Sequence, residues 1–423
     1  MNNKMKTSDI SENLKGSEIL NIGGKVRELL LKGEKIYNLT IGDFDTSIFS
    51  TPKLLKDAVI DAYNSGYTNY PVANGEPELR KNAAEYLKKV GGPDYIENEI
   101  LVSAGARPLI YSFYRTVVDP GDTVLFPVPS WNNDAYSFLN RAETIEIPTK
   151  PENKFIPTAE EIAPHISKVS LIALCSPLNP GGTVFERTQL EEICDLILNE
   201  NKKRLSENRK PVYLLFDSIY WQLNYGEAEF LHPVMIRPEI KDFMISIDGI
   251  SKAFSATGLR VGWAYGPEDI IKKMSALLTH VGAWAPKPEQ LGTAAFLAQF
   301  DEVQKYLDHH RFELSERLNG FYNGFKQLKS EGFSVDAIKP EAALYLSVNL
   351  ELKGKQTPTG KMLNSAREIT DWLIDEVRVA LVPFYAFGSS DELCWFRLSV
   401  GRASLDDIPK IIETFRKSLS ELK

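Results

Sequence analysis

The stretch FMISI at residues 243–247 is followed closely by SKAFSATGLR at residues 251–260. The first run is prone to form a strand. The second places a single lysine, Lys252, just beyond that strand, followed by small residues and then Arg260. A lysine that bonds to an aldehyde cofactor needs such a rigid mount and a cation for the cofactor's phosphate. Considered alone, however, a lysine is more often a solvated surface charge.

Length and composition describe an ordinary globular protein. The 423 residues are 43% hydrophobic and 25% charged, which is enough for a large core. A chain of this length usually forms about two or three domains. The formal net charge is −8, and the lysines and arginines are spread along the chain. This pattern argues against nucleic acid as a partner and favours small-molecule ligands.

Targeting and metal-binding signals are weak. Residues 1–9 are polar and lack the apolar core of a signal peptide. No apolar run approaches the roughly 20 residues of a membrane helix, so we expect a cytoplasmic protein without membrane association. Cys175, Cys194 and Cys394 are scattered without CxxC spacing, which predicts free thiols and no zinc site. The histidines form no HExxH pattern, so no metal is expected.

Apolar runs alternate with helical patterns between about residues 95 and 270, which favours strand–helix units and a largely parallel sheet. Several of these runs are apolar on both faces, as expected for strands covered by helices on each side. A helix is predicted from Thr188 to about Leu205. The predicted strands span residues 100–103, 123–126, 171–174, 212–216, 244–247 and 261–264.

The pattern changes after Pro286. A long amphipathic helix is predicted from Asp301 to about Ser330, and it leads into a second domain. In that domain we expect strands at residues 343–348 and 395–400, and helices at about 366–377 and from about 405.

Polar residues follow three of the predicted strands. They are Asn179-Pro180-Gly181, the pair Asp217 and Tyr220, and Lys252. In open α/β sheets, ligands bind beyond the carboxyl ends of the strands. Each segment alone has an ordinary interpretation, because Asn-Pro-Gly is commonly a turn and an aspartate after a strand is commonly a cap. Their succession in this order favours a ligand site.

With these motifs the chain resembles the class I aminotransferases, which are pyridoxal-phosphate (PLP) enzymes of fold type I. The resemblance covers nearly the whole chain and includes residues 70–80 (YPVANGEPELR) and 103–107 (SAGAR). The motifs that carry it are Asn179-Pro180-Gly181, Asp217-x-x-Tyr220, Ser251-Lys252 with Arg260, and Phe396-Arg397-Leu398-Ser399.

The resemblance implies an α/β fold. A large domain would hold a mostly parallel seven-stranded sheet between helices, and a smaller α+β domain would accompany it. The implied boundaries are residues 1–48 for an N-terminal arm with part of the small domain, 49–298 for the large PLP-binding domain, and 299–423 for the small C-terminal domain.

The resemblance also implies a cofactor site. Lys252 would form a Schiff base with pyridoxal 5'-phosphate and then move the substrate's Cα proton. Asp217 would keep the ring nitrogen protonated, and Tyr220 with Asn179 would hydrogen-bond the phenolic oxygen. The phosphate would be held by Ala106, Arg107, Ser251 and Arg260, and Trp131 would stack on the ring. A buried core residue is the alternative role for Trp131.

Substrate and partner contacts follow from the same resemblance. Arg397 would bind the substrate α-carboxylate, with Asn179 and the backbone of Gly42 beside it. An ordinary turn glycine is the alternative for Gly42. Tyr70 would reach the phosphate of the neighbouring subunit, which implies a homodimer with shared active sites.

The implied activity is transfer of an amino group between an L-amino acid and a 2-oxo acid by a ping-pong mechanism. A carbon–sulfur β-lyase is an alternative, because Lys252 and Asp217 would serve either reaction. A ligand-sensing, non-catalytic domain is a further alternative. It normally requires a DNA-binding segment, and the approximately 40 residues before Ile41 are too short and insufficiently basic for one.

Some positions depart from the commonest family pattern. Gly181 stands where threonine is usual, and Phe384 and Ala342 stand where glycine is usual. None of these changes removes a catalytic group. The amino donor and acceptor stay open, and the residues that would bear on side-chain preference are Phe384, Tyr385, Phe387, His280, Trp284 and Lys287.

Overall fold

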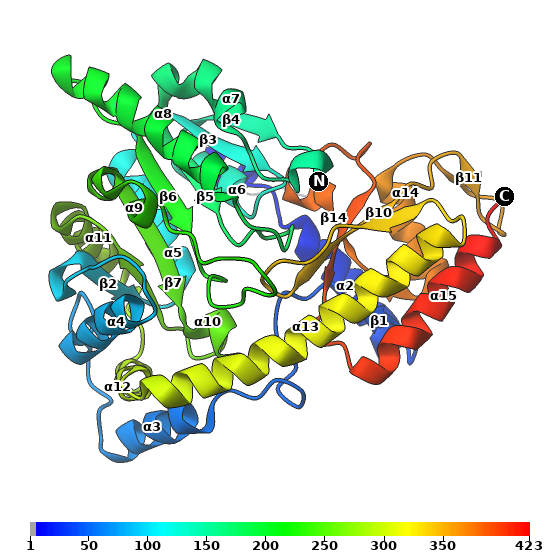
Figure 1. Ribbon diagram of the computed structural model, residues 1–423, viewed down its shortest axis with the longest axis horizontal. Coiled ribbons are helices and arrows are strands. Elements are labelled where there is room, and N and C mark those ends of the chain that lie inside the picture. Colours follow the sequence, from blue (N-terminus) through cyan, green and yellow to red (C-terminus); the bar gives the residue numbers. More distant parts are fainter. Residues whose placement is uncertain (1–5) are drawn as a thin grey trace.

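The computed structural model describes residues 6–423 and shows a larger α/β part and a smaller α+β part (Figure 1). Helix α13 (Phe300–Ser330) extends from the larger part along the smaller one. It matches the long helix predicted from Asp301 to Ser330, and it packs beside the last helix, α15 (Ile408–Ser420).

The larger part is built on a seven-stranded sheet with the order β2-β8-β7-β6-β5-β3-β4. Only β8 runs antiparallel to its neighbours, so the predicted, mostly parallel seven-stranded sheet is confirmed. The strands are β2 (Ile100–Ser103), β3 (Thr123–Val128), β4 (Glu143–Pro148), β5 (Val169–Cys175), β6 (Tyr213–Asp217), β7 (Met244–Gly249) and β8 (Gly262–Tyr265).

Strand β4 was not predicted from the sequence. It lies at the edge of the sheet and pairs with β3 alone. Its residues read ETIEIP, and most of them are exposed or half-buried. An edge strand with polar outward-facing residues lacks the continuous apolar run by which the central strands were recognised.

Helices cover both faces of the sheet. Along β5, Leu171 packs with α5, α6 and α11 on one face, whereas Ile172 packs with α4, α8 and α12 on the other. This alternation follows from the opposite direction of successive side chains in a strand. The helices of this part are α3 (Lys53–Asn64), α4 (Pro77–Lys89), α5 (Ala106–Val117), α6 (Asn133–Leu139), α7 (Ala159–Ile162), α8 (Arg187–Ser206), α9 (Pro233–Ile236), α10 (Ile250–Ala253), α11 (Glu268–Val281) and α12 (Lys287–Leu297).

The smaller part has its own antiparallel sheet, with the order β14-β15-β10-β9. A core separate from that of the larger part packs between this sheet, α13 and α15. The N-terminal helices α1 (Asp9–Asn13) and α2 (Glu18–Leu31) precede β1 (Tyr37–Asn38), which pairs in parallel with β13 (Val379–Ala380). The other elements are β9 (Val335–Ala337), β10 (Tyr345–Leu350), β11 (Lys355–Gln356), β12 (Met362–Leu363), α14 (Ala366–Trp372), β14 (Val382–Pro383) and β15 (Trp395–Ser399).

Strand β10 begins two residues later than predicted. Ala343 has a φ of 62°, a left-handed conformation that a strand does not accommodate. Its N–H donates to the carbonyl of Leu223, and the preceding Ala342 forms an isolated bridge with Asn224. Residues 342–343 therefore tie the smaller part to the loop after β6 before the strand begins.

Within the described residues, no helix combines the length and the apolar character needed to cross a membrane.

Candidate active site

The carboxyl ends of β5, β6 and β7 lie side by side, because Cys175 is in register with Asp217 and Asp217 with Ile247. The loop after β5 carries Asn179, β6 ends at Asp217, and Lys252 lies on α10 just after β7. The sheet therefore brings together three residues that the sequence placed only at successive strand ends.

The Lys252 amine is half-buried and lies near three arginine side chains. Its Nζ donates a hydrogen bond to the carbonyl of Gly42 at 2.6 Å. The pKa of Lys252 is lowered to about 8, mainly by loss of solvent, and the guanidinium groups of Arg397, Arg107 and Arg260 contribute to the same shift. The carboxylate of Asp43 opposes this shift. A lysine with such a pKa exchanges its proton readily near neutral pH, as a nucleophile and base must.

Asp217 has the opposite perturbation. Burial raises the pKa of its carboxyl to about 6, although the N–H of Ile219 and the charge of Lys252 both act to lower it. The Ile219 N–H donates to Asp217 Oδ1 at 3.1 Å. A desolvated carboxylate of this kind is stabilised by a cation placed beside it.

Two tyrosines meet beside Arg397. The hydroxyl groups of Tyr220 and Tyr345 are hydrogen-bonded at 2.8 Å, and either can donate. Burial raises the pKa of both phenols, so both stay protonated at neutral pH. Tyr345 was not among the predicted site residues, since nothing in its local sequence relates it to Tyr220.

Arg397 is a buried cation, 2% exposed, without a carboxylate partner among the described residues. Its Nη1 donates to Asn179 Oδ1 at 2.9 Å and its Nη2 to the carbonyl of Thr40 at 2.6 Å, whereas its Nε has no partner. The guanidinium lies 4.5 Å from the ring centroid of Tyr345 and 5.0 Å from that of Phe387. The group is oriented in advance, and its uncompensated charge favours an anionic ligand.

A second cationic region lies at the start of α5. Arg260 Nη2 donates to the carbonyl of Ala104 at 3.0 Å, and the Arg107 guanidinium lies 4.3 Å over the ring of Trp131. Burial and the charge of Arg107 together lower the pKa of Arg260. Two guanidinium groups near a helix N-terminus that begins at Ala106 suit a phosphate. Ser251, 8% exposed, precedes Lys252 on α10.

The Arg260 side chain lies so close to the backbone at residue 105 that only glycine fits there. This residue has a φ of 87°, and a Cβ there would lie 2.3 Å from Arg260 Nη2. Glycine alone accommodates both the left-handed conformation and the neighbouring guanidinium.

The segment around Gly42 closes the site from the smaller part. A Cβ at Gly42 would lie 2.5 Å from Tyr345 Oη, so a side chain there would collide with the tyrosine. Next to it, Asp43 Oδ1 accepts a hydrogen bond from Thr257 Oγ1 at 2.7 Å. Sequence reasoning singled out this segment for its glycine and missed Asp43, which anchors it to the Lys252 loop.

Tyr70 lies apart from this cluster. It is 83% exposed, and its ring packs edge-on against Trp284 at 5.7 Å. Nearby, Lys287 Nζ lies 4.0 Å from Glu76 Oε1. Among the interactions of residues 6–423, none joins Tyr70 to Lys252 or Arg260 within one chain.

The loop that was predicted to lie near the substrate side chain, residues 384–387, directs its aromatic side chains to different surroundings. Phe384 is fully buried against Phe155, with a centroid distance of 4.9 Å, and Tyr385 packs under the Arg367 guanidinium at 4.2 Å. Phe387 is the aromatic of this loop that contacts Arg397. His280, in the last turn of α11, is exposed.

Comparison with known proteins agrees with this geometry. The family model for aminotransferase classes I and II matches residues 34–415. An aspartate aminotransferase of Rhizobium meliloti (strain 1021) is 30% identical over 389 residues, 90% of this chain and 89% of the relative. An aspartate aminotransferase of Geobacillus stearothermophilus is 29% identical over 415 residues, 98% of each. A crystal structure of the Rhizobium meliloti aspartate aminotransferase matches with a TM-score of 0.89 at 26% identity, covering 99% of this chain and 100% of that one.

The fold and the site define a PLP-dependent enzyme of fold type I. This chain belongs to the class I and II aminotransferases. Its substrates are accordingly amino acids and 2-oxo acids.

The residues present fit pyridoxal 5'-phosphate. The cradle at Gly105, which a Cβ would fill, leaves backbone N–H groups and two guanidiniums available for a phosphate. The raised pKa of Asp217 means that its ionised form is poorly stabilised in the protein alone, and a cation such as a protonated ring nitrogen would stabilise it. Lys252 supplies an amine that loses its proton readily.

Proposed function

We propose that the aminotransferase works by a ping-pong mechanism in which Lys252 is both the covalent anchor of the cofactor and the proton-transfer group. The observation that carries this proposal is the Lys252 amine itself, held at 2.6 Å by the Gly42 carbonyl with a pKa lowered to about 8. When bound, PLP supplies an aldehyde that bonds to amines and a ring that accepts the electron pair of the substrate Cα–H bond.

Lys252 would take the proton from the substrate Cα as a neutral amine and, as an ammonium group, would deliver it on the cofactor side of the reacting carbon–nitrogen bond. Both forms are accessible near neutral pH because the pKa is about 8. Arg397, Arg107 and Arg260 favour the neutral form electrostatically, whereas Asp43 favours the charged form. Burial is the largest cause of the lowered pKa, and these opposing charges adjust it, so that both states of the amine are populated near neutral pH.

Asp217 and the Tyr220 hydroxyl would set the electronic state of the bound ring. Asp217 supplies a negative charge for the ring nitrogen, and its own pKa falls when that cation binds. Tyr220 would donate to the phenolic oxygen, with Tyr345 as the partner behind it. Asn179 would contribute a further side-chain contact, and its amide also fixes Arg397.

The phosphate would be bound by Ala106, Arg107, Ser251 and Arg260. The supporting observations are the N-terminus of α5 and the paired guanidiniums. Trp131 would stack on the cofactor ring. Its indole lies under the Arg107 guanidinium, which places it next to the proposed phosphate ligands.

Substrate binding would rest on Arg397. Its guanidinium is held by Asn179 and by the Thr40 carbonyl, so little entropy is lost when it binds a carboxylate. The backbone at Gly42 would approach the same carboxylate. We propose an acidic amino donor of the aspartate type, because both relatives described above are named aspartate aminotransferase.

We propose a homodimer with shared active sites. The support is an exposed face around α3 and Tyr70 whose large apolar side chains have no cover in the single chain. Tyr70 would reach across this face to the partner's phosphate site. The exposed residues of this face are Leu54, Ile60, Tyr63, Tyr67, Tyr70 and Val72.

The domain division is also a proposal, with boundaries at residues 1–48, 49–298 and 299–423. It is supported by two separate cores, one around the seven-stranded sheet and one around α13, β10 and α15. The inclusion of the N-terminal segment in the small domain is supported by the pairing of β1 with β13. A cytoplasmic location stays a prediction from the sequence.

A half-reaction screen tests the activity and the donor. Holoenzyme is mixed with single amino acids without an acceptor, and loss of the cofactor's visible absorption is followed. We expect L-aspartate to convert it faster than L-alanine or L-phenylalanine, and parallel double-reciprocal plots with an acceptor. Pyruvate and ammonia formed from a cysteine conjugate without acceptor would instead support the β-lyase.

Mixing of inactive variants tests the shared site. Lys252→Ala and Tyr70→Ala would each be inactive alone if both residues are needed. Because a mixed dimer then holds one site with neither substitution, we expect partial recovery of activity when the two variants are dissociated and reassociated together. No recovery, or an active monomer in sedimentation, would overturn the shared-site dimer.

A further inference from the structure

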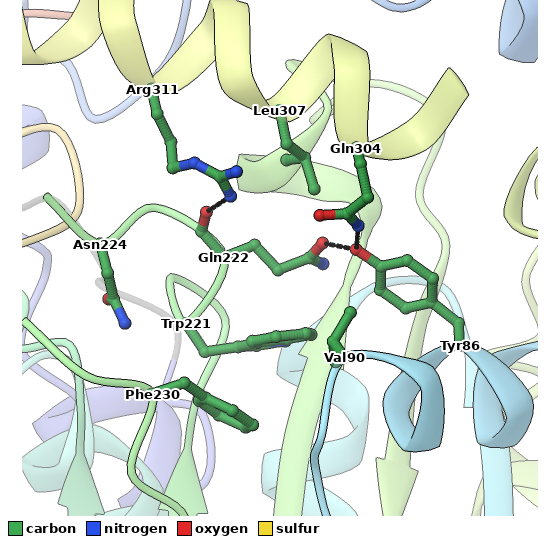
Figure 2. Close-up of a pocket in the computed structure, with 9 residues that line it drawn as sticks. All are labelled: Tyr86, Val90, Trp221, Gln222, Asn224, Phe230, Gln304, Leu307 and Arg311. Carbon is green, nitrogen blue, oxygen red and sulfur yellow. Dashed lines mark hydrogen bonds between the residues drawn. The ribbon is translucent and has the colours of Figure 1, made fainter. Parts of the chain in front are cut away.

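A cavity of about 240 Å³ lies between α4, α13 and the loop after β6 (Figure 2). It is several times larger than the space of one water molecule, which is about 30 Å³. Its wall includes Trp221 and Gln222, the two residues that directly follow Tyr220. The proposed function assigns no role to this cavity.

One side of the cavity is aromatic and apolar. The rings of Trp221 and Phe230 lie 4.4 Å apart with an interplanar angle of 36°. Val90 and Leu307 complete this apolar lining. Such a wall suits a small aromatic ring, which buries a large apolar area with few rotatable bonds.

The cavity also contains a buried polar group without a partner. Gln222 is 4% exposed, and its Oε1 accepts a hydrogen bond from the Tyr86 hydroxyl at 2.6 Å. That hydroxyl in turn accepts from Gln304 Nε2 at 3.1 Å (Figure 2). These bonds fix the Gln222 amide, yet its Nε2 donor has no partner in the protein. A buried donor of this kind favours a ligand with an acceptor atom.

The charge of the cavity lining indicates which kind of acceptor the ligand carries. Arg311 is the charged residue of the lining, and no carboxylate lines the cavity in the described part of the chain. Its Nη1 donates to the Gln222 carbonyl at 3.2 Å, and its Nη2 bonds Asp308 at 2.5 Å. Asp308 is 73% exposed, so solvent screens this ion pair, and the remaining guanidinium donors can serve a carboxylate.

The cavity is connected to the Lys252 segment through Trp221. Its Nε1 donates to Asp248 Oδ2 at 2.8 Å, and Asp248 Oδ1 accepts from the N–H of Gly249 at 2.7 Å. Gly249 is the residue before α10, which carries Lys252. Trp221 also lines a second, smaller cavity with Ser176 and Pro177, in the loop that leads to Asn179.

We propose that this cavity is a second ligand site that takes a small aromatic carboxylate and changes the activity of the enzyme through Trp221. The ring lies against Trp221 and Phe230, and the carboxylate accepts from Arg311 and Gln222 Nε2. A shift of Trp221 moves the neighbouring Tyr220 and the Asp248–Gly249 turn. The site is distinct from the Arg397 region, where substrate carboxylates are proposed to bind.

Binding is tested by calorimetric titration of PLP-loaded enzyme with phenylacetate. Because phenylacetate can also occupy the Arg397 region, the titration is made in the Arg397→Ala variant. We expect one site per subunit in that background. Adding Arg311→Met should weaken phenylacetate binding at least about tenfold, as the loss of a charge-assisted hydrogen bond does. The same substitution should weaken binding of the neutral analogue phenylacetamide only a little.

Two further variants control this result. Lys305→Met removes an exposed cation from the same helix and should leave phenylacetate binding unchanged. Val90→Trp fills the cavity from its rim and should abolish binding. No binding in the Arg397→Ala background, or equal weakening by Arg311→Met and Lys305→Met, would overturn the site.

The functional effect is tested in the otherwise unchanged holoenzyme. We expect phenylacetate to alter kcat at saturating amino donor, and Arg311→Met to remove this effect while keeping the basal kcat. Purely competitive inhibition that persists in Arg311→Met would overturn the regulatory role.

Discussion

The hydroxyl of Tyr345, from the smaller part of the molecule, is hydrogen-bonded at 2.8 Å to the hydroxyl of Tyr220, from the larger part. The ring of Tyr345 also lies against Arg397, and its hydroxyl fills the space that a side chain at Gly42 would need. One residue thus contacts the proposed cofactor ligand, the proposed substrate ligand and the segment that holds Lys252.

Tyr345→Phe is expected to change the cofactor's electronic state. A hydroxyl that donates to Tyr220 makes Tyr220 a better donor to the cofactor's phenolic oxygen, and its loss weakens that bond. We predict a higher pH midpoint for the visible absorption change of bound PLP, and a fall in kcat of about three- to tenfold, equivalent to roughly 1 kcal/mol. A spectrophotometric pH titration and steady-state rates measure both.

Tyr225→Phe is the matched control. It also removes a hydroxyl that the protein hydrogen-bonds, in this case to the carbonyl of Ala343, but outside the site. Equal midpoints for the two variants would show that Tyr345 has only a structural role.

Lys252 should control the pH dependence of cofactor binding. Its pKa in the apoenzyme is lowered to about 8, and only the neutral amine attacks an aldehyde. We therefore expect the rate of PLP incorporation to rise with pH, with a midpoint near 8. A lysine with the ordinary pKa of about 10.4 would instead give a midpoint near that value. Stopped-flow absorbance measures the rate.

Arg397→Met should move this midpoint upward, because Arg397 lies among the cations that lower the pKa of Lys252. The exposed Arg402 offers a comparison, since Arg402→Met removes the same charge at the surface. An unchanged midpoint in Arg397→Met would contradict the electrostatic account of the Lys252 pKa.

Asp217 should make the apoenzyme less stable as pH rises. Its pKa is raised from 3.8 to about 6 in the folded protein, so the native state binds more protons than the unfolded state between these values. The free energy of unfolding then falls as pH rises from about 4 to about 6. We expect the loss to be on the order of 1–2 kcal/mol, because Asp217 is half-buried, so that solvent reduces the cost of ionising it in the folded protein.

The measurement is the difference in unfolding free energy between the wild-type apoenzyme and Asp217→Asn at several pH values. The difference cancels the contributions of other titrating groups. Saturating PLP should reverse the trend in the wild type, since a ring cation stabilises the ionised carboxylate. A difference that does not vary with pH would contradict the raised pKa.

The sequence predicted the part of the site that the sheet builds. Asn179, Asp217 and Lys252 follow three neighbouring strands, and parallel register alone brings them together. Tyr345 and Asp43 could not be found in this way, because they reach the site from the smaller part. Their positions depend on how two cores pack, which no local pattern of residues records.

The same distinction explains the errors in the fold. Helix α13 was predicted to within one residue, because it is long and amphipathic. Strand β4 was missed since its edge position hides the apolar pattern, and β10 was begun too early because Ala343 adopts a left-handed conformation that alanine rarely adopts.

Gly105→Ala should separate phosphate binding from stability. A Cβ at this position would lie 2.3 Å from Arg260 Nη2, so the guanidinium has to move, and the φ of 87° is strained for alanine. We expect PLP affinity to fall at least about tenfold, which corresponds to the loss of one charge-assisted contact. Equilibrium titration of the apoenzyme with PLP measures this change. Gly121→Ala is the matched control, because Gly121 has a φ of 90° with no atom near its Cβ position, and it should lose stability without losing PLP affinity. If Gly105→Ala and Gly121→Ala bind PLP equally well, Arg260 is not positioned by the close approach at Gly105.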